Sequence, residues 1–336
     1  MAGLSARTAI LPPLKRRSLL ALGVTAVLAP RAYGQAARSS VEDYDLAEAV
    51  GRGRTPAANS SALLEAIRAN AGRRLRLPPL TIEFEGVALD ADELGLGLEI
   101  VGQGATGYRG SVLKNVGAGD ALTITNRSKQ SYNGPIRLTG FAIHGHAASG
   151  SGIVAEQING QCRFEFLWFD GHGKNSVVAK RCYGMEIRSC ISNNPGANGF
   201  EFVDAANNIV LDHLHAFQAK GANIKIAGAQ TSFAPVLNAC DVSYSRGVGL
   251  WIDNAVGASV TGFYAEDCVG PSALIGRAAR SFTISGGYNQ NGQMVLDGAG
   301  LVEGVFSAGK GGIAAGPLVE VKNCTFATGA LLKRGA

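Results

Sequence analysis

The chain has 336 residues, of which 46 are glycine, and charged residues make up 17%. Its formal net charge of +5 arises at the N-terminus, because five of the 31 basic residues and none of the 26 acidic ones lie in residues 1–36. The rest of the chain carries equal numbers of both, which argues against a nucleic-acid or anionic-membrane partner. The length suits one elongated repeat domain, and frequent glycine suits a fold with many tight turns.

The N-terminus has the pattern of an export signal. Arg16 and Arg17 precede an apolar run from Leu19 to Leu28, and small residues follow at two candidate cleavage positions. This order is typical of a signal peptide, and the paired arginines match the twin-arginine (Tat) type. The run is shorter than the about 20 residues that span a bilayer, although an uncleaved anchor is the alternative. We predict a Tat signal peptide in residues 1–36, a periplasmic or secreted protein, and no membrane span after signal removal.

Residues 37–58 are polar and small, and we predict a linker there. A short helix from Ser61 to Ala71 follows, with Asn59 or Ser60 as its N-cap. Residues 74–82 form a strand, a turn at Pro78 and a second strand, and residues 98–104 form a strand that ends in a glycine turn.

A repeat begins near residue 136. Apolar residues recur at intervals of 23 to 26 positions. This first column consists of Leu138, Phe164, Ile187, Leu211, Leu237, Val260 and Ile284. The next position is polar in each repeat, and the third position after the column is apolar or small. Three columns in register over seven repeats predict stacked parallel strands about 4.8 Å apart, a β-solenoid over residues 59–330.

The register of the columns also predicts whether the six cysteines form disulfides. Cys190 and Cys240 both stand in an inward column, two repeats apart. The spacing of about 9–10 Å is too long for a disulfide. We therefore predict that most cysteines are buried thiols, and a disulfide of Cys182 with another cysteine stays open.

Two motifs carry a resemblance to a known family. Leu77-Pro78-Pro79-Leu80 leads into a strand after the predicted helix, and Gly102-Gln103-Gly104 ends the next one. This order resembles the right-handed parallel β-helix proteins of the pectate-lyase-like superfamily, with Leu80 in place of their usual glycine. It is also similar to the Tat-exported β-helix repeat proteins of proteobacteria, a group without assigned chemistry. The resemblance covers roughly residues 59–328 and implies an all-β, right-handed parallel β-helix with an N-terminal capping helix.

One outward face holds the candidate catalytic residues. The fourth and sixth positions after the first column should share a face, since side chains alternate along a strand. This places Asp241 and Glu266 one repeat apart, with Cα atoms about 8 Å apart. That separation is compatible with a general acid and a base of an inverting glycosidase. His215, the neighbour of Asp241 in its column, could orient that carboxylate or take a proton. Ordinary solvated side chains on a polar face are the alternative interpretation.

Other polar and aromatic positions are candidates for substrate binding. Tyr264 and Tyr288 could stack on a sugar ring, and we predict further substrate-binding residues at Asp170, His172, Arg188, Tyr244 and Asp267.

Two motifs admit a structural alternative. Gly171-His172-Gly173 is similar to a motif of polygalacturonases, but the other motifs found there are missing, so a plain turn is the alternative. Arg188 could be the base of a lyase, or it could stand in a salt-bridge ladder with its column neighbours Glu165 and Asp212.

The sequence predicts no metal site. His144, His146 and His172 could in principle bind a metal, but no cysteine or carboxylate stands at zinc-site spacing. The calcium-binding Asp cluster of pectate lyases is not recognisable, so we expect no cofactor, and a requirement for calcium stays open.

These observations lead to two hypotheses. The first is an exported polysaccharide lyase or glycoside hydrolase that uses one lateral face of the β-helix. The second is a non-catalytic periplasmic or surface β-helix that binds polysaccharide or a protein. Fold alone does not decide between them, and the sequence leaves the oligomeric state open.

Overall fold

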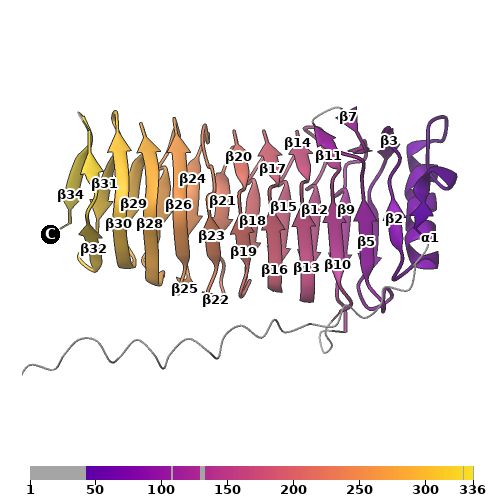
Figure 1. Cartoon of the computed structure of the whole chain (residues 1–336), viewed down its shortest axis with the longest axis horizontal. Coiled ribbons are helices and arrows are strands. Elements are labelled where there is room, and N and C mark those ends of the chain that lie inside the picture. Colours follow the sequence, from indigo (N-terminus) through magenta and orange to yellow (C-terminus); the bar gives the residue numbers. More distant parts are fainter. Residues whose placement is uncertain (1–42, 107–108, 129–132, 328, 336) are drawn as a thin grey trace, which may run out of the picture. The chain divides into compact units, whose positions relative to one another are not determined.

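The computed structural model describes residues 43–106, 109–128, 133–327 and 329–335, and the predicted signal peptide lies outside them. In this part of the chain, strands form three long sheets in which each strand pairs in parallel with its equivalents one turn earlier and later. The result is the predicted parallel β-helix (Figure 1). We call one turn a rung, and each complete rung contributes one strand segment to each sheet.

Sheet 1 contains the strands that carry the first apolar column. Its main path is β1 (Tyr44–Asp45), β2 (Arg74–Arg76), β5 (Leu98–Val101), β10 (Ile136–Thr139), β13 (Asn159–Glu165), β16 (Tyr183–Arg188), β19 (Val210–Asp212), β23 (Val236–Asn238), β26 (Ser259–Glu266), β28 (Arg280–Gln290), β30 (Ala299–Ala308) and β32 (Val319–Lys322). Three short strands join its margins: β22 (Ser232–Phe233), β25 (Ala255–Val256) and β33 (Thr325–Phe326).

Sheet 2 follows sheet 1 in each rung. Its strands are β3 (Thr81–Phe84), β8 (Val112–Asn115), β11 (Ala142–His144), β14 (Trp168–Asp170), β17 (Ile191–Asn193) and β20 (His215–Phe217). Beyond β20 it continues through bridges from His215 to Asp241 and from Asp241 to Tyr264, so the second halves of β26, β28 and β30 extend it.

Sheet 3 closes each rung. Its strands are β4 (Val87–Asp90), β9 (Leu122–Thr125), β12 (Ile153–Glu156), β15 (Val177–Lys180), β18 (Phe200–Val203), β21 (Ala222–Ile226), β24 (Val248–Ile252), β27 (Ala273–Ile275), β29 (Gln293–Leu296), β31 (Gly312–Ala315) and β34 (Leu331–Arg334). A small antiparallel pair, β6 (Ala105–Thr106) and β7 (Arg109–Gly110), stands apart from the three sheets.

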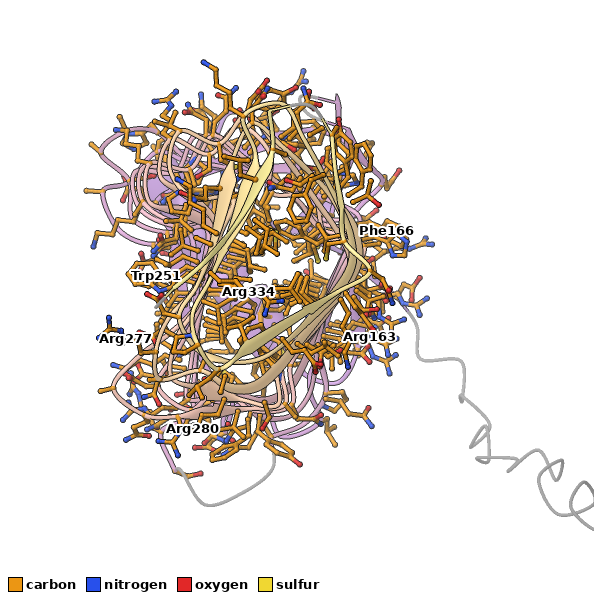
Figure 2. The ribbon with its side chains drawn as sticks, turned by 90° about the vertical axis from the view of Figure 1, so that its left-hand side faces the viewer. Arg163, Phe166, Trp251, Arg277, Arg280 and Arg334 are labelled. Carbon is orange, nitrogen blue, oxygen red and sulfur yellow. The ribbon has the colours of Figure 1, made fainter. Side chains whose placement is uncertain are left out.

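The predicted columns are confirmed residue by residue. Leu138 pairs with Phe164, and the pairing continues without a slip to Ile284. The side chains of this column are at most 1% exposed. Viewed along the stack, inward side chains fill the space between the sheets (Figure 2). Burial of this apolar area, at about 25 cal/mol per Å², is the main stabilising term of the fold.

A column of left-handed residues turns the chain from sheet 1 to sheet 2. It includes Phe166, Ser189, His213 and Ala239, with φ between 47° and 52°. A left-handed L-residue costs roughly 1–2 kcal/mol. The cost is offset because each of these amides donates to a carbonyl of the next rung, as Phe166 does to Arg188 at 3.1 Å. The turn is therefore stabilised by stacking and not by glycine alone.

The capping helix begins earlier than predicted. α1 (Pro56–Ala69) has Thr55 as its N-cap, whose hydroxyl accepts from the amide of Ala58 at 3.2 Å, and Pro56 occupies the first turn. Asn59 is not the cap: it is 1% exposed, and its side chain donates to the Glu83 carbonyl at 2.9 Å.

Part of the segment predicted as a linker is also folded. It contains β1 and a 3-10 helix, η1 (Leu46–Glu48), and both Leu46 and Val50 join the buried core. The structure thus extends the folded domain to residues before position 59.

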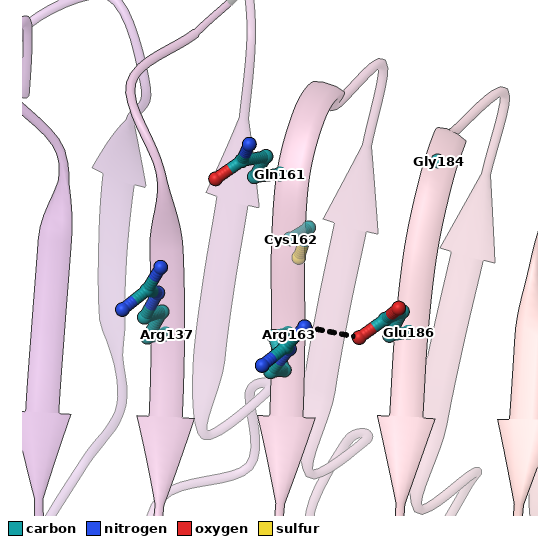
Figure 3. Close-up of a pocket in the computed structure, with 6 residues that line it drawn as sticks. All are labelled: Arg137, Gln161, Cys162, Arg163, Gly184 and Glu186. Carbon is teal, nitrogen blue, oxygen red and sulfur yellow. Dashed lines mark ion pairs between the residues drawn. The ribbon is translucent and has the colours of Figure 1, made fainter. Parts of the chain in front are cut away.

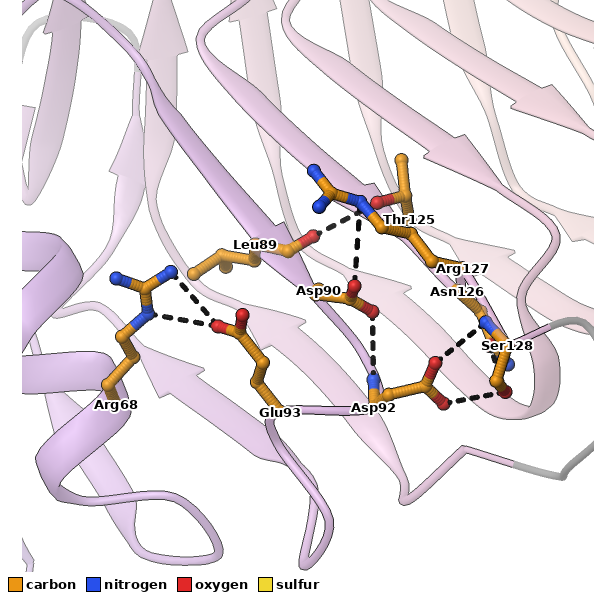
Figure 4. Close-up of polar contacts among 9 residues, drawn as sticks. All are labelled: Arg68, Leu89, Asp90, Asp92, Glu93, Thr125, Asn126, Arg127 and Ser128. Atoms are coloured by element: carbon orange, nitrogen blue, oxygen red, sulfur yellow. Dashed lines mark hydrogen bonds and ion pairs between the residues drawn. The ribbon is translucent and has the colours of Figure 1, made fainter.

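Polar contacts fasten α1 to the first rungs (Figure 4). Arg68 of α1 pairs with Glu93, which follows β4, at 2.9 Å. Asp92 accepts from the amide and hydroxyl of Ser128 in the next rung, at 2.8 and 3.0 Å. The buried residues Leu63 and Ile67 pack α1 against the end of the core, which a solenoid must cover, and the exposed Arg68–Glu93 pair adds a surface contact. Among the described residues, no helix is long and apolar enough to cross a membrane.

The six cysteines are free thiols, as predicted for most of them, and Cys182 forms no disulfide. Five are buried, and burial raises the pKa of Cys182, Cys190 and Cys240 to about 12. The Cys190 thiol donates to the Arg188 carbonyl at 3.2 Å. These thiols are inert parts of the core.

We predict that only Cys324, which is half-buried, reacts quickly with a thiol reagent at pH 8 in the native protein. A thiol must be accessible and must ionise to react. Burial raises the pKa of Cys324 too, so accessibility is what sets this thiol apart from the five buried ones. The measurement is the number of fast-reacting thiols before and after unfolding in urea, with Cys324→Ala as control. A second fast thiol in the native state would contradict the buried assignment.

Candidate functional site

The outer face of sheet 2 brings together most of the predicted catalytic residues. His215, Asp241, Tyr264, Tyr288 and Phe306 occupy one column on successive rungs. Glu266 stands two residues after Tyr264 on β26 and points to the same face, because the intervening Ala265 is fully buried. We call this group the Asp241–Glu266 site, and it consists of His215, Asp241, Tyr244, Tyr264, Glu266 and Tyr288.

One oxygen of the Asp241 carboxylate accepts hydrogen bonds, and the other faces a histidine. Its Oδ1 accepts from the amide of Ser243 at 3.0 Å and from the Ser243 hydroxyl. Its Oδ2 lies 3.6 Å from Nδ1 of His215, which is half exposed. The Ser243 contacts fix the carboxylate in orientation, so that one oxygen faces the histidine.

Glu266 lies beside two tyrosine hydroxyls. Tyr264 donates its hydroxyl to Oε2 of Glu266 at 3.1 Å. The negative charge of Glu266 raises the pKa of Tyr244, and burial together with the hydrogen bond to Glu266 raises that of Tyr264. Both hydroxyls therefore remain protonated donors at neutral pH.

The aromatic side chains of this column form a stack. The ring of Tyr288 lies between those of Tyr264 and Phe306, with centroids 5.3 and 5.8 Å away and planes within 19°. Both faces of Tyr288 are thus covered, so it cannot stack on a sugar as predicted. Tyr264 ends the stack. Its other ladder neighbour is Asp241, which carries no ring, so one face of Tyr264 is directed toward the carboxylates.

The other predicted binding residues divide into two groups. Tyr244 and Asp267 adjoin Glu266 in the turn after sheet 2, where both have left-handed backbones, and Asp267 accepts from Asn291 at 2.7 Å. Asp170 lies on β14, three rungs from Asp241, and accepts from Asn193 of the next rung at 2.8 Å. At about 4.8 Å per rung, Asp170 is roughly 14 Å away along the stack.

His172 does not face solvent. Its side chain is 1% exposed, and its Nε2 lies 3.0 Å from the Ile143 carbonyl, to which it donates. Burial lowers its pKa to about 4. Its assignment to substrate binding was wrong, because the ring is buried and bonded to a backbone carbonyl of the preceding rung.

Arg188 lies on the outer face of sheet 1 and not beside Asp241. Its column neighbours are Glu165 and Asp212, as predicted. Its ion pair, however, is with Glu186 of its own strand at 3.4 Å. The predicted salt-bridge ladder was wrong in its contacts, since the guanidinium reaches along the strand and not across it.

Sequence reasoning missed a pocket on the outer face of sheet 1 (Figure 3). It has a volume of about 230 Å³, and its lining consists of Arg137, Gln161, Cys162, Arg163, Gly184 and Glu186. The available signal was the position just before the first column, which reads Arg137, Arg163 and Glu186 on successive rungs.

No metal centre accompanies these sites. In the part of the chain that the structure describes, no group of three or more His, Cys, Asp or Glu side chains is arranged to hold a metal ion.

No family model matches the chain, and no curated protein matches its sequence. Solved structures match its fold. A DFA-IIIase from Arthrobacter chlorophenolicus A6 aligns with a TM-score of 0.65 at 14% identity, over 88% of this chain and 84% of the enzyme. Tailspike protein 2 from Escherichia coli O157:H7 bacteriophage CAB120 aligns with a TM-score of 0.61 at 11% identity, over 88% of this chain and 42% of the tailspike. This chain therefore spans less than half of that protein, and identities this low show a shared fold.

We predict that His172 makes the protein sensitive to acid. Its pKa is about 4 in the folded state and 6.5 ordinarily, so the unfolded state binds the proton more readily. Stability is therefore full above pH 6.5 and falls by roughly 3 kcal/mol as the pH drops through 4. The measurement is the free energy of unfolding in urea at pH 7 and pH 4. In His172→Gln, the difference between the two pH values should shrink, and an equal difference in both proteins would contradict the prediction.

Proposed function

We propose that this protein is an exported, carbohydrate-active protein that hydrolyses a polysaccharide at the Asp241–Glu266 site. The observation that carries the proposal is the pairing of Asp241 with Tyr264 across one rung, with the Tyr264 hydroxyl bonded to Glu266. Two carboxylates and one exposed tyrosine ring then share the surface of a single sheet. Sugars stack on aromatic faces, and glycoside hydrolysis uses two carboxyl groups.

The structural relatives support a carbohydrate substrate. The DFA-IIIase was also solved in complex with DFA-III, and another solved relative is the enzymatically active domain of tailspike protein 2. Their folds match this one at 14% and 11% identity.

The contacts suggest a role for each carboxyl group. Ser243 occupies Oδ1 of Asp241, which leaves Oδ2 to carry a proton that His215 can exchange. Tyr264 donates to Oε2 of Glu266, Tyr244 also bonds this carboxylate, and in the proposed role the carboxylate accepts from water as well. In the proposed step, Asp241 protonates the leaving glycosidic oxygen while its bond to C1 breaks. Glu266 takes a proton from water, whose oxygen bonds to C1, and solvent later restores both groups. Strand geometry places the two Cα atoms about 8 Å apart, and a carboxyl separation of that size would favour inversion.

A lyase reaction is less well supported. It needs a base that removes the proton next to a uronate carboxylate. Arg188 was the candidate, but it is paired with Glu186 and belongs to sheet 1. Non-catalytic binding of a polysaccharide or a protein is the second function. It is favoured by the stack of Tyr264, Tyr288 and Phe306, which would make a rigid binding surface whether or not catalysis occurs.

We predict that Asp241→Asn and Glu266→Gln each lower the hydrolysis rate at least 100-fold, since each removes one proton-transfer group. The measurement is reducing-end release from a panel of neutral and acidic polysaccharides, with the anomer of the product read by NMR. Asp297→Asn and Glu303→Gln, which lie outside the Asp241–Glu266 site, are matched controls and should retain activity. Binding without cleavage by the unaltered protein would favour the second function, and cleavage by both variants would refute the assigned roles.

Export by the Tat route is part of the proposal, on the strength of Arg16 and Arg17 before the apolar run. The double change of both arginines to lysine should abolish export, because Tat signals require the arginine pair. The measurement is the share of the protein in periplasmic and cytoplasmic fractions of a Tat-competent host. Unchanged export of the variant would indicate another route.

A further inference from the structure

The pocket on sheet 1 is built around a local irregularity of β13. Asn159 pairs with Tyr183, but the next pairing joins Cys162 to Met185, so β13 contains one extra residue. Gly160, with φ 154°, lies inside this bulge, and the adjacent Gln161 is exposed at the pocket. Bulges of this kind redirect side chains and often lie beside functional sites. Here the bulge presents an amide that can both donate and accept hydrogen bonds.

Arg137 lines this pocket beside a second arginine, Arg163. Its two neighbours in the column are Glu99 and Arg163. Glu99 is already paired with Arg74 at 3.2 Å, and Arg163 with Glu186 at 2.7 Å (Figure 3). Among the described residues, none forms an ion pair or a hydrogen bond with the Arg137 side chain, although it is partly buried. Two like charges on adjacent rungs destabilise each other, so a bound anion would relieve this arrangement.

The pocket chemistry defines the anion. Its charged lining consists of Arg137, Arg163 and Glu186, which leaves one net positive charge. A guanidinium matches a planar carboxylate with two parallel hydrogen bonds. The Gln161 amide can donate to and accept from hydroxyl groups, whereas both oxygens of Glu186 are engaged by Arg163 and Arg188. The volume of about 230 Å³ is below the roughly 300–1,000 Å³ of drug-sized ligands, which suits one sugar residue.

We propose that this pocket binds a uronate residue of an acidic polysaccharide, with its carboxylate on Arg137 and Arg163. The pocket is separate from the Asp241–Glu266 site, because Arg137 lies on another sheet and four rungs earlier than Asp241, about 19 Å along the stack. The proposal does not rest on hydrolysis, since a binding protein could use the same pocket. The Asp241–Glu266 site itself is acidic and would repel a carboxylate.

The test is calorimetric titration of the full chain with a tetrameric oligouronide and with a neutral tetrasaccharide. We expect the oligouronide to bind at least tenfold more tightly than the neutral sugar. Arg137→Ala and Arg137→Gln should each remove this preference, with thermal melting confirming that at least one is folded. Arg277→Ala is the matched control, because Arg277 is exposed on the opposite side of the β-helix from Arg163 (Figure 2). This change should leave the preference for the oligouronide unaltered.

Three outcomes would overturn the proposal. The first is equal binding of acidic and neutral sugars by the unaltered protein. The second is tighter binding of a sulfated tetrasaccharide than of the oligouronide, which would assign the pocket to another anion. The third is loss of oligouronide binding in Asp241→Asn, which would show that the oligouronide binds at the Asp241–Glu266 site and not in this pocket. Because Asp241→Asn should bind like the unaltered protein, failure of hydrolysis and failure of this pocket are distinguishable.

Discussion

The in-register pairing of each strand with its equivalent on the next rung is the constraint on which the rest of the structure depends. Parallel pairing repeats the same side chain position about every 4.8 Å, so one apolar column becomes a continuous core from Leu138 to Ile284. It also compensates the strained turns. The left-handed backbone of Phe166 persists because its amide bonds the next rung. A slip of one residue would turn every inward side chain to the solvent.

The two candidate sites lie where this repetition is interrupted. An aromatic column stacks ring on ring through Tyr288, and the stack ends where Asp241 replaces a ring. A charged column pairs arginine with glutamate, and the pairing fails where Arg137 and Arg163 follow each other. Where either column is regular, its side chains stack on or pair with their neighbours in the column. The break leaves a ring face or a guanidinium available to a ligand.

The two sites differ in charge and therefore in what they would recognise. The Asp241–Glu266 site joins carboxylates to a ring face, which suits a neutral sugar ring and proton transfer. The pocket at Arg137 has one excess positive charge, which suits a uronate. They lie on different sheets of one rigid stack, so a long polysaccharide could contact both only by crossing the left-handed turn marked by Phe166 (Figure 2). Recognition and chemistry would then be separate properties of separate faces.

The sequence by itself determined the rungs, the inward columns, the buried thiols and the shared face of Asp241 and Glu266, because strand periodicity and repeat length are local properties of the chain. Only the tertiary structure decided that His172 turns inward, that Arg188 pairs with Glu186, and that no residue in the described part of the chain pairs with Arg137. It also moved the start of α1 to Pro56, where a buried Asn59 bonds the first rung. The reason is physical: a column shows which residues are neighbours, but the conformation of long polar side chains depends on which partners lie within reach across the stack.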